Sequence, residues 1–160
     1  MIGDRQGGVT LWGLEERQIL AELLVLSQRP GAPRPISVSI SADGSLLAVG
    51  YDKSQGAAQL YTLLRSKPGG SSPTPTLKGT FGTQVSYGSV FAFSSDQRFF
   101  ATVPRGEIEL YDPFSLAFVT RLPLPTIGKP AERDRVECLA FSPDSRYVAA
   151  ATVQGMVSLW

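Results

Sequence analysis

Short apolar runs alternate with turn signals along the whole chain, and the C-terminal part shows the pattern most clearly. An apolar, half-alternating run, Val136 to Phe141, is followed by the turn sequence Ser142-Pro143-Asp144-Ser145. A second apolar run covers Tyr147 to Val153. The pair Gln154-Gly155 then suits a two-residue hairpin turn, and Met156 to Trp160 forms a third run. This stretch predicts three short antiparallel strands joined by tight turns.

The same pattern occurs twice more upstream. One copy has its strands at 36–40, 45–51 and 57–63, and the other has them at 89–93, 98–103 and 107–111. The remainder of a still earlier copy, residues 8–12, opens the chain. An aromatic residue closes the third strand each time, at Trp12, Tyr61, Tyr111 and Trp160, which are spaced by 49, 50 and 49 residues. A period of this length with about four short strands is typical of the blades of a β-propeller.

The repeated motifs resemble those of the WD-repeat family. The matching segments are Phe141-Ser142-Pro143-Asp144, Val157-Ser158-Leu159-Trp160, Ile40-Ser41-Ala42-Asp43-Gly44 and Phe93-Ser94-Ser95-Asp96, with Tyr111-Asp112 and Tyr61-Thr62 in place of Trp-Asp. The resemblance implies an all-β fold of four-stranded antiparallel propeller blades. Residues 1–160 would form a single partial domain, with copies at about 17–63, 76–112 and 117–160 after the leftover strand 8–12.

One feature of the family is missing from every copy. The chain contains no histidine, so the Gly-His dipeptide that often precedes the inner strand, and the hydrogen-bond network built on it, are absent. The repeats are therefore degenerate members of the pattern. Lactonase-like propellers, which have a similar succession of strand, Asp turn and strand, are alternative relatives.

About three blades fit into the chain, whereas closed propellers have four to eight, so we expect an incomplete ring. One interpretation is a piece of a larger propeller. The other is a homodimer that completes the ring, in which Gln18 to Leu26 of one copy supplies the missing outer strand of the other. The composition of Gln18 to Leu26 favours a helix, but the repeat register predicts an outer strand, and we follow the register.

Composition narrows the cellular setting and the partners. The formal net charge is +1, from 15 basic and 14 acidic residues, which does not favour nucleic acid or a membrane surface as a partner. No apolar run has the length of a membrane span, and the N-terminus lacks the pattern of a signal peptide. We therefore expect a cytoplasmic protein, with the nucleus as the alternative. Cys138, the single cysteine, is expected as a small buried hydrophobic residue of an inner strand.

The sequence offers little for catalysis. Without histidine there is no histidine base, no Ser-His-Asp triad and no His-ligated metal, and one cysteine cannot form a cysteine-rich zinc site. Asp43, Asp96 and Asp144 recur at one position of each copy, where capping of a turn explains them better than paired catalytic carboxylates. We therefore expect a protein that is not an enzyme and has no cofactor or metal.

The loops at the two rims of a propeller are left for function, because the blade faces are used for packing. By resemblance to the family, the loops that enter the inner strands and the second hairpin turn share one rim, which binds proteins. This rim would carry the candidate residues Arg34, Lys53, Tyr87, Arg105, Lys129, Arg133, Arg135 and Gln154. Its mild basic character favours acidic or phosphorylated segments of other proteins as partners.

A non-catalytic interaction scaffold or adaptor is thus the first functional hypothesis. The alternative is a propeller enzyme or ligand sensor with its site in the central channel. That site would need polar residues on the inner strands, where we expect Ser37, Val38, Ser39, Ser89, Phe91, Glu137 and Leu139. Only Glu137 among them is ionisable, which favours the scaffold.

Overall fold

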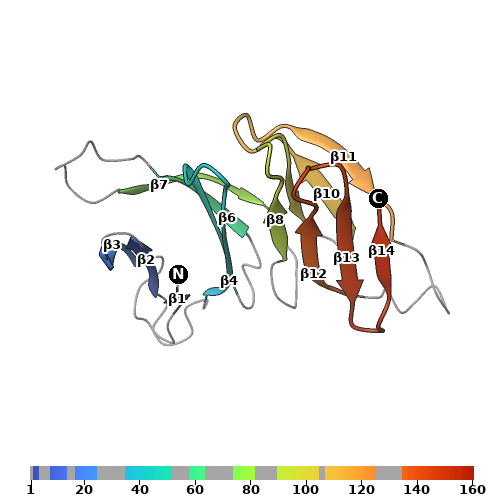
Figure 1. The fold of residues 1–160 in the computed structure, drawn as a ribbon, viewed down its shortest axis with the longest axis horizontal. Helices are drawn as coiled ribbons and strands as arrows, with labels where there is room; N and C mark the ends of the chain where they lie inside the picture. The colour runs from blue at the N-terminus through green and yellow to red at the C-terminus, as the bar shows by residue number, and fades with distance from the viewer. Residues whose placement is uncertain are drawn as a thin grey trace.

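The computed structural model describes residues 2–3, 8–13, 17–24, 35–51, 58–63, 74–81, 90–104, 107–124 and 135–160. Within these ranges the chain forms fourteen β-strands and no helix. The strands make four antiparallel sheets that follow one another along the chain, which we call sheets 1 to 4 (Figure 1). The predicted all-β fold is confirmed. In the described segments there is accordingly no helix that could cross a membrane.

Each sheet is built from strands that are consecutive in the sequence. Sheet 1 contains β1 (Ile2–Gly3), β2 (Gly8–Gly13) and β3 (Gln18–Leu24). Sheet 2 contains β4 (Pro35–Ile40), β5 (Leu46–Tyr51), β6 (Ala58–Leu63) and β7 (Pro75–Phe81). Sheet 3 contains β8 (Phe91–Phe93), β9 (Phe100–Thr102), β10 (Ile108–Tyr111) and β11 (Phe118–Leu122). Sheet 4 contains β12 (Val136–Phe141), β13 (Val148–Thr152) and β14 (Val157–Leu159).

The outer strands join the three strands that precede them. β7 pairs with β6, and β11 pairs with β10, so each sheet is offset by one strand from the copies seen in the sequence. The leftover strand 8–12 is the middle strand of sheet 1, between β1 and β3. The segment Gln18–Leu24 is a strand, as the repeat register predicts, because pairing with β2 outweighs its helical composition. The strand that one of the two interpretations passed to a second copy is therefore already paired within its own chain.

Apolar clusters between successive sheets hold the arc together. Val9 of sheet 1 packs with Leu47, Val49 and Tyr61 of sheet 2. Leu60 of sheet 2 belongs to a second cluster, shared with sheet 3, whose centre is aromatic. There the ring of Phe100, which is completely buried, lies 5.1 Å from that of Phe81 and 5.0 Å from that of Phe93, measured between centroids.

A third cluster joins sheets 3 and 4. It includes Ala101, Ile108 and Leu110 of sheet 3, and Leu139 and Ala150 of sheet 4. In each sheet, one face thus covers the sheet before it and the other face is covered by the sheet after it. We call the latter the forward face. The strands β4, β8 and β12 are neighbours in space, so they are the inner strands of the arc.

A Ser-x-Asp turn joins the first and second strands of sheets 2, 3 and 4. In sheet 3 the hydroxyl of Ser94 donates to Asp96 Oδ1 at 2.7 Å and accepts from the amide of Phe99 at 2.9 Å, and Asp96 Oδ1 also accepts from the amide of Arg98. The turns that begin at Ser41 and Ser142 have the same bonds. The three aspartates therefore cap turns, as the sequence predicts.

The residue after each of these aspartates adopts a left-handed conformation, with φ of 72° at Gly44, 62° at Gln97 and 60° at Ser145. Where this residue is not glycine, its side chain reaches the turn of the preceding sheet. Ser145 Oγ accepts from the amide of Asp96 at 2.9 Å. With its amide nitrogen toward Asp43, Gln97 donates to that carboxylate at 3.0 Å. These contacts repay the strain of the left-handed backbone by linking neighbouring sheets at one rim.

We expect Ser94→Ala to lower the free energy of unfolding by about 1–3 kcal/mol, because the Ser94 hydroxyl is fully buried and the half-buried amide of Phe99 loses its acceptor. Ser142→Ala is the matched control, since its turn is exposed and water can replace the lost bond. Urea denaturation of both variants measures the difference. Equal losses in the two variants would contradict the role assigned to burial.

The turn aspartates also make stability depend on pH. The serine hydroxyls are the largest cause that lowers the pKa of Asp43, Asp96 and Asp144 below the ordinary value of 3.8, followed by backbone amides. Because the folded pKa is depressed, the carboxylates stabilise the fold above pH 3.8, and this stabilisation is lost as the pH falls through the folded pKa. Acid titration of thermal stability should show a steep fall below that pH, and Asp96→Asn should make it shallower.

The turn between β13 and β14 requires a glycine. Gly155 has φ of 83°, and a Cβ atom there would meet no atom within 4 Å, so backbone conformation alone sets the cost of a side chain. We expect Gly155→Val to destabilise the protein by about 1–2 kcal/mol, and Gly155→Asn to cost much less, because asparagine tolerates this region. Thermal unfolding of both variants tests this, and a valine variant as stable as the parent would refute the turn assignment.

Candidate functional site

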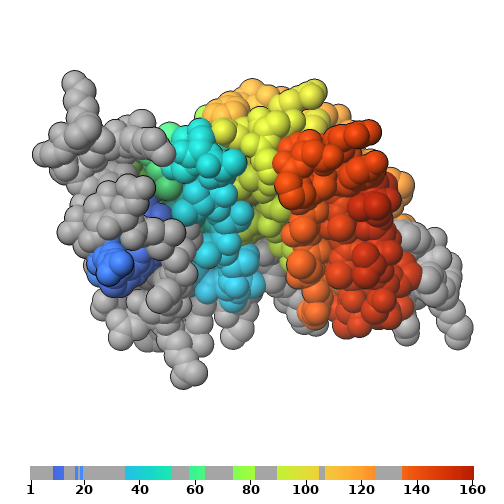
Figure 2. All heavy atoms as spheres, viewed as in Figure 1, coloured from blue at the N-terminus to red at the C-terminus, as the bar shows by residue number. Residues whose placement is uncertain are grey.

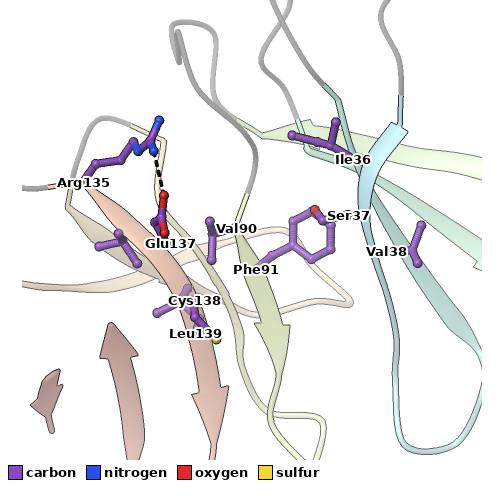
Figure 3. Close-up of a pocket in the computed structure, with 10 residues that line it drawn as sticks. Ile36, Ser37, Val38, Val90, Phe91, Arg135, Glu137, Cys138 and Leu139 are labelled. Atoms are coloured by element: carbon purple, nitrogen blue, oxygen red, sulfur yellow. Dashed lines mark hydrogen bonds and ion pairs between the residues drawn. The ribbon is translucent and has the colours of Figure 1, made fainter. Parts of the chain in front are cut away.

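The three inner strands enclose a hollow with a volume of about 420 Å³. Figure 3 shows side chains of β4, β8 and β12 around it, with the ring of Phe91 between β8 and β4. Its walls are mixed, because apolar side chains lie beside Ser37, Arg135 and Glu137. The lining residues are Ile36, Ser37, Val38, Val90, Phe91, Arg135, Val136, Glu137, Cys138 and Leu139.

Irregular pairing near the start of two inner strands shapes this hollow. The register between β4 and β5 shifts between Pro35 and Ser37, and that between β12 and β13 shifts between Val136 and Cys138. The extra residues are Ile36 and Glu137, and both are exposed on the wall of the hollow. A bulge turns an additional side chain away from the regular alternation. The same backbone device therefore presents an apolar group in one blade and a carboxylate in another.

Arg135 and Glu137 form the polar part of the site. Arg135 Nη2 lies 2.7 Å from Glu137 Oε1, and the dashed line in Figure 3 marks this ion pair at one end of the hollow. Both side chains are about half exposed, so the pair contributes little to stability. It brings one positive and one negative group to one end of a hollow that also has apolar walls.

Cys138 does not have the environment that the sequence predicts. We expected a buried side chain, but it is exposed on the wall of the hollow. Cys138 pairs with Ala151 and lies on the forward face of sheet 4, which no other described sheet covers. The apolar pattern of the strand was read correctly. Its burial depends on a neighbour that the described part of the chain does not supply.

Two of the predicted rim residues, Arg135 and Gln154, belong to the described chain. Arg135 precedes β12, and Gln154 lies in the turn between β13 and β14. The amide of Val153 donates to the carbonyl oxygen of Arg135 at 2.9 Å, so both residues lie at the same end of sheet 4. The other candidates lie outside the described residues, namely Arg34, Lys53, Tyr87, Arg105, Lys129 and Arg133.

The inner positions named from the sequence agree in large part with the hollow. Ser37, Val38, Phe91, Glu137 and Leu139 line it, whereas Ser39 does not, and Ser89 is outside the described residues. Sequence reasoning missed Ile36, Val90, Val136 and Cys138 as wall residues. A strict alternation of inward and outward side chains cannot find Ile36, Val136 and Cys138, because the bulges place consecutive residues on the same wall, and Val90 precedes the strand β8.

The chemistry available to the hollow is limited. Its ionisable wall residues are Arg135, Glu137 and Cys138. Among the described residues, no group of three or more histidine, cysteine, aspartate or glutamate side chains is close enough to hold a metal ion. The arrangement can bury an apolar side chain and offer a charged group beside it, which is the chemistry of recognition.

Comparison with known proteins supports the architecture. Residues 124–160 match the family model of the WD domain, G-beta repeat. No curated protein sequence matches the chain significantly. Among solved structures, the β-propeller domain of Cps50 (Swd1) from Myceliophteria thermophila is similar, with a TM-score of 0.69 and 14% sequence identity.

That similarity covers 99% of this chain and 46% of the Cps50 chain, so this chain spans less than half the length of that domain. All four sheets therefore follow the curvature of a propeller, and their ring does not close within the described residues. The WD model matches the segment that contains sheet 4, where the repeat motifs are most complete. The chain thus has the β-propeller fold and carries a WD repeat at residues 124–160.

Proposed function

We propose that this chain is a non-catalytic interaction scaffold that binds segments of other proteins at the rim beside Arg135. The observation that carries the proposal is the hollow between β4, β8 and β12, with partly apolar walls and an ion pair at one end. WD-repeat propellers bind other proteins as a class, and the fold and the matched repeat support the same type of function here.

The composition of the walls indicates the kind of segment that fits. Ile36 and Cys138, which are exposed on the wall, offer apolar contacts to one side chain of a partner, beside the buried ring of Phe91. The guanidinium of Arg135 can form paired hydrogen bonds with a carboxylate or a phosphate next to that side chain. Glu137 already holds the guanidinium, so an acidic group on the partner would compete with Glu137 for it. The proposed ligand is therefore an acidic or phosphorylated segment with an apolar anchor residue.

The three turn aspartates support a non-catalytic function, because their carboxylates are used to hold the turns. The carboxylates of Asp43, Asp96 and Asp144 each accept bonds from a serine hydroxyl and from backbone amides of their own turn. These bonds favour the ionised form at neutral pH and fix its position. Such groups serve the fold and are poorly suited to moving protons between a substrate and water.

Binding of fluorescent peptides tests this proposal. A peptide with a leucine flanked by aspartates, and its phosphoserine counterpart, should bind the full chain more tightly than a version with lysines. Arg135→Glu should weaken the binding of the acidic peptide by about tenfold or more, equivalent to about 1.4 kcal/mol. Glu137→Gln should strengthen the binding of this peptide, because the competing carboxylate is removed. Fluorescence anisotropy measures the binding of each peptide to the parent chain and to each variant.

Arg146→Glu is the matched control. Arg146 lies in the turn after β12, at the opposite end of that strand from Arg135, where it stacks near the ring of Tyr147. The substitution changes the net charge by the same amount as Arg135→Glu but leaves the proposed rim intact. Equal losses in both arginine variants would show a general effect of charge and would refute the site. Equal binding of acidic and basic peptides would refute the proposed partner chemistry.

A further inference from the structure

Sheet 4 presents an uncharged apolar face to solvent. The register pairs Cys138 and Val157 with Ala151, and Ala140 and Leu159 with Ala149, which places these six residues on the forward face. None of the six carries a charge. Val157 is 76% exposed and Leu159 is 65% exposed. Contiguous apolar surface of this kind marks an interaction site on a folded protein.

Equivalent faces of the other sheets are covered. In sheet 3 the corresponding row of Ala92, Ala101 and Leu110 packs under sheet 4. In sheet 2 the row of Ala48 and Leu60 packs under sheet 3. The open face of sheet 4 has the same apolar character as these buried faces. It is therefore built to receive the rear face of another propeller blade.

The edge of sheet 4 is open as well. In sheets 1, 2 and 3 the strands β2, β6 and β10 each pair with an outer strand, which is β3, β7 and β11 in turn. Among the described residues, β14 has β13 on one side and no strand on the other. In Figure 2 the atoms of residues 135–160, in orange and red, form one end of the arc with no described blade beyond them. An open edge next to an open apolar face invites association.

The other end of the arc presents the complementary surface. Trp12 of sheet 1 is 43% exposed, whereas Tyr61, at the equivalent position of sheet 2, is 7% exposed because sheet 1 covers it. Tyr111 and Trp160 occupy this position in sheets 3 and 4 and also pack against the preceding sheet. Trp12 is thus a rear-face aromatic residue for which the described chain supplies no preceding sheet.

We propose that two copies of this chain associate head to tail, with the forward face of sheet 4 of each copy packed on the rear face of sheet 1 of the other. A contact between two different surfaces closes into a ring when each copy spans half a turn. This chain spans 46% of the propeller that it matches, so two copies supply nearly a whole ring. The inference does not depend on the proposed peptide site, and it leaves β3 paired within its own chain.

The solution mass tests this association. Light scattering after size exclusion should give twice the 17.2 kDa of one chain. Val157→Lys combined with Leu159→Lys should raise the dissociation constant by about thirtyfold or more, and so should Trp12→Glu. These side chains are exposed in the single copy, so the variants keep their folded cores. Val119→Lys on β11, which is 47% exposed, is the matched control and should leave the mass unchanged.

Mixing the variants separates this arrangement from a symmetric contact. The Val157 and Leu159 variant keeps its sheet 1 surface, and the Trp12 variant keeps its sheet 4 face, so together they should form a heterodimer through one intact contact. Cys138, the only cysteine, gives a second measurement, because alkylation of its thiol should slow as protein concentration rises. A single-chain mass at all concentrations, or an open series of larger assemblies, would overturn the two-copy ring.

Discussion

The packing of one sheet face on the next is the interaction on which this molecule depends. An isolated sheet of three or four strands is marginally stable, because one of its apolar faces remains in water. Here Phe100 is completely buried only because sheet 2 contributes Phe81 and Leu60 to the same cluster. Stability is therefore a sum of contacts between neighbours, as in other repeat proteins. Sheets 2 and 3 have two such neighbours, whereas sheets 1 and 4 have one each within the described chain.

The two rims of the arc serve different purposes for a physical reason. At one rim, short turns are fixed by serine and aspartate side chains, and Gln97 and Ser145 connect each turn to the one before it. Little of that surface is left to vary without a loss of hydrogen bonds. At the other rim, the inner strands β4 and β12 begin, and each has a bulge near its start, at Ile36 and at Glu137. Sequence variation there costs less stability, because that rim lies beyond the ends of the regular strands.

Much of the fold was predictable from the sequence, because a period near 50 residues and alternating apolar positions constrain strands strongly. The assignment of Gln18–Leu24 shows the value of the period, since composition alone would have given a helix. The site was less predictable. The bulges at Ile36 and Glu137 depend on how two strands are paired, and the exposure of Cys138 depends on a neighbouring sheet. Both are tertiary facts that local sequence does not encode.

Recognition in such a molecule must come from residues that break the repeat. Residues that recur from copy to copy, such as the turn aspartates of sheets 2 to 4 and the closing aromatics, serve the fold in the same way each time. At the bulge, by contrast, one inner strand carries Ile36 and another carries Glu137, although the backbone shift is the same. The repeat fixes where a side chain points, and the departure from the repeat decides its chemistry. A degenerate propeller can therefore keep its architecture while its inner walls become specific for one partner.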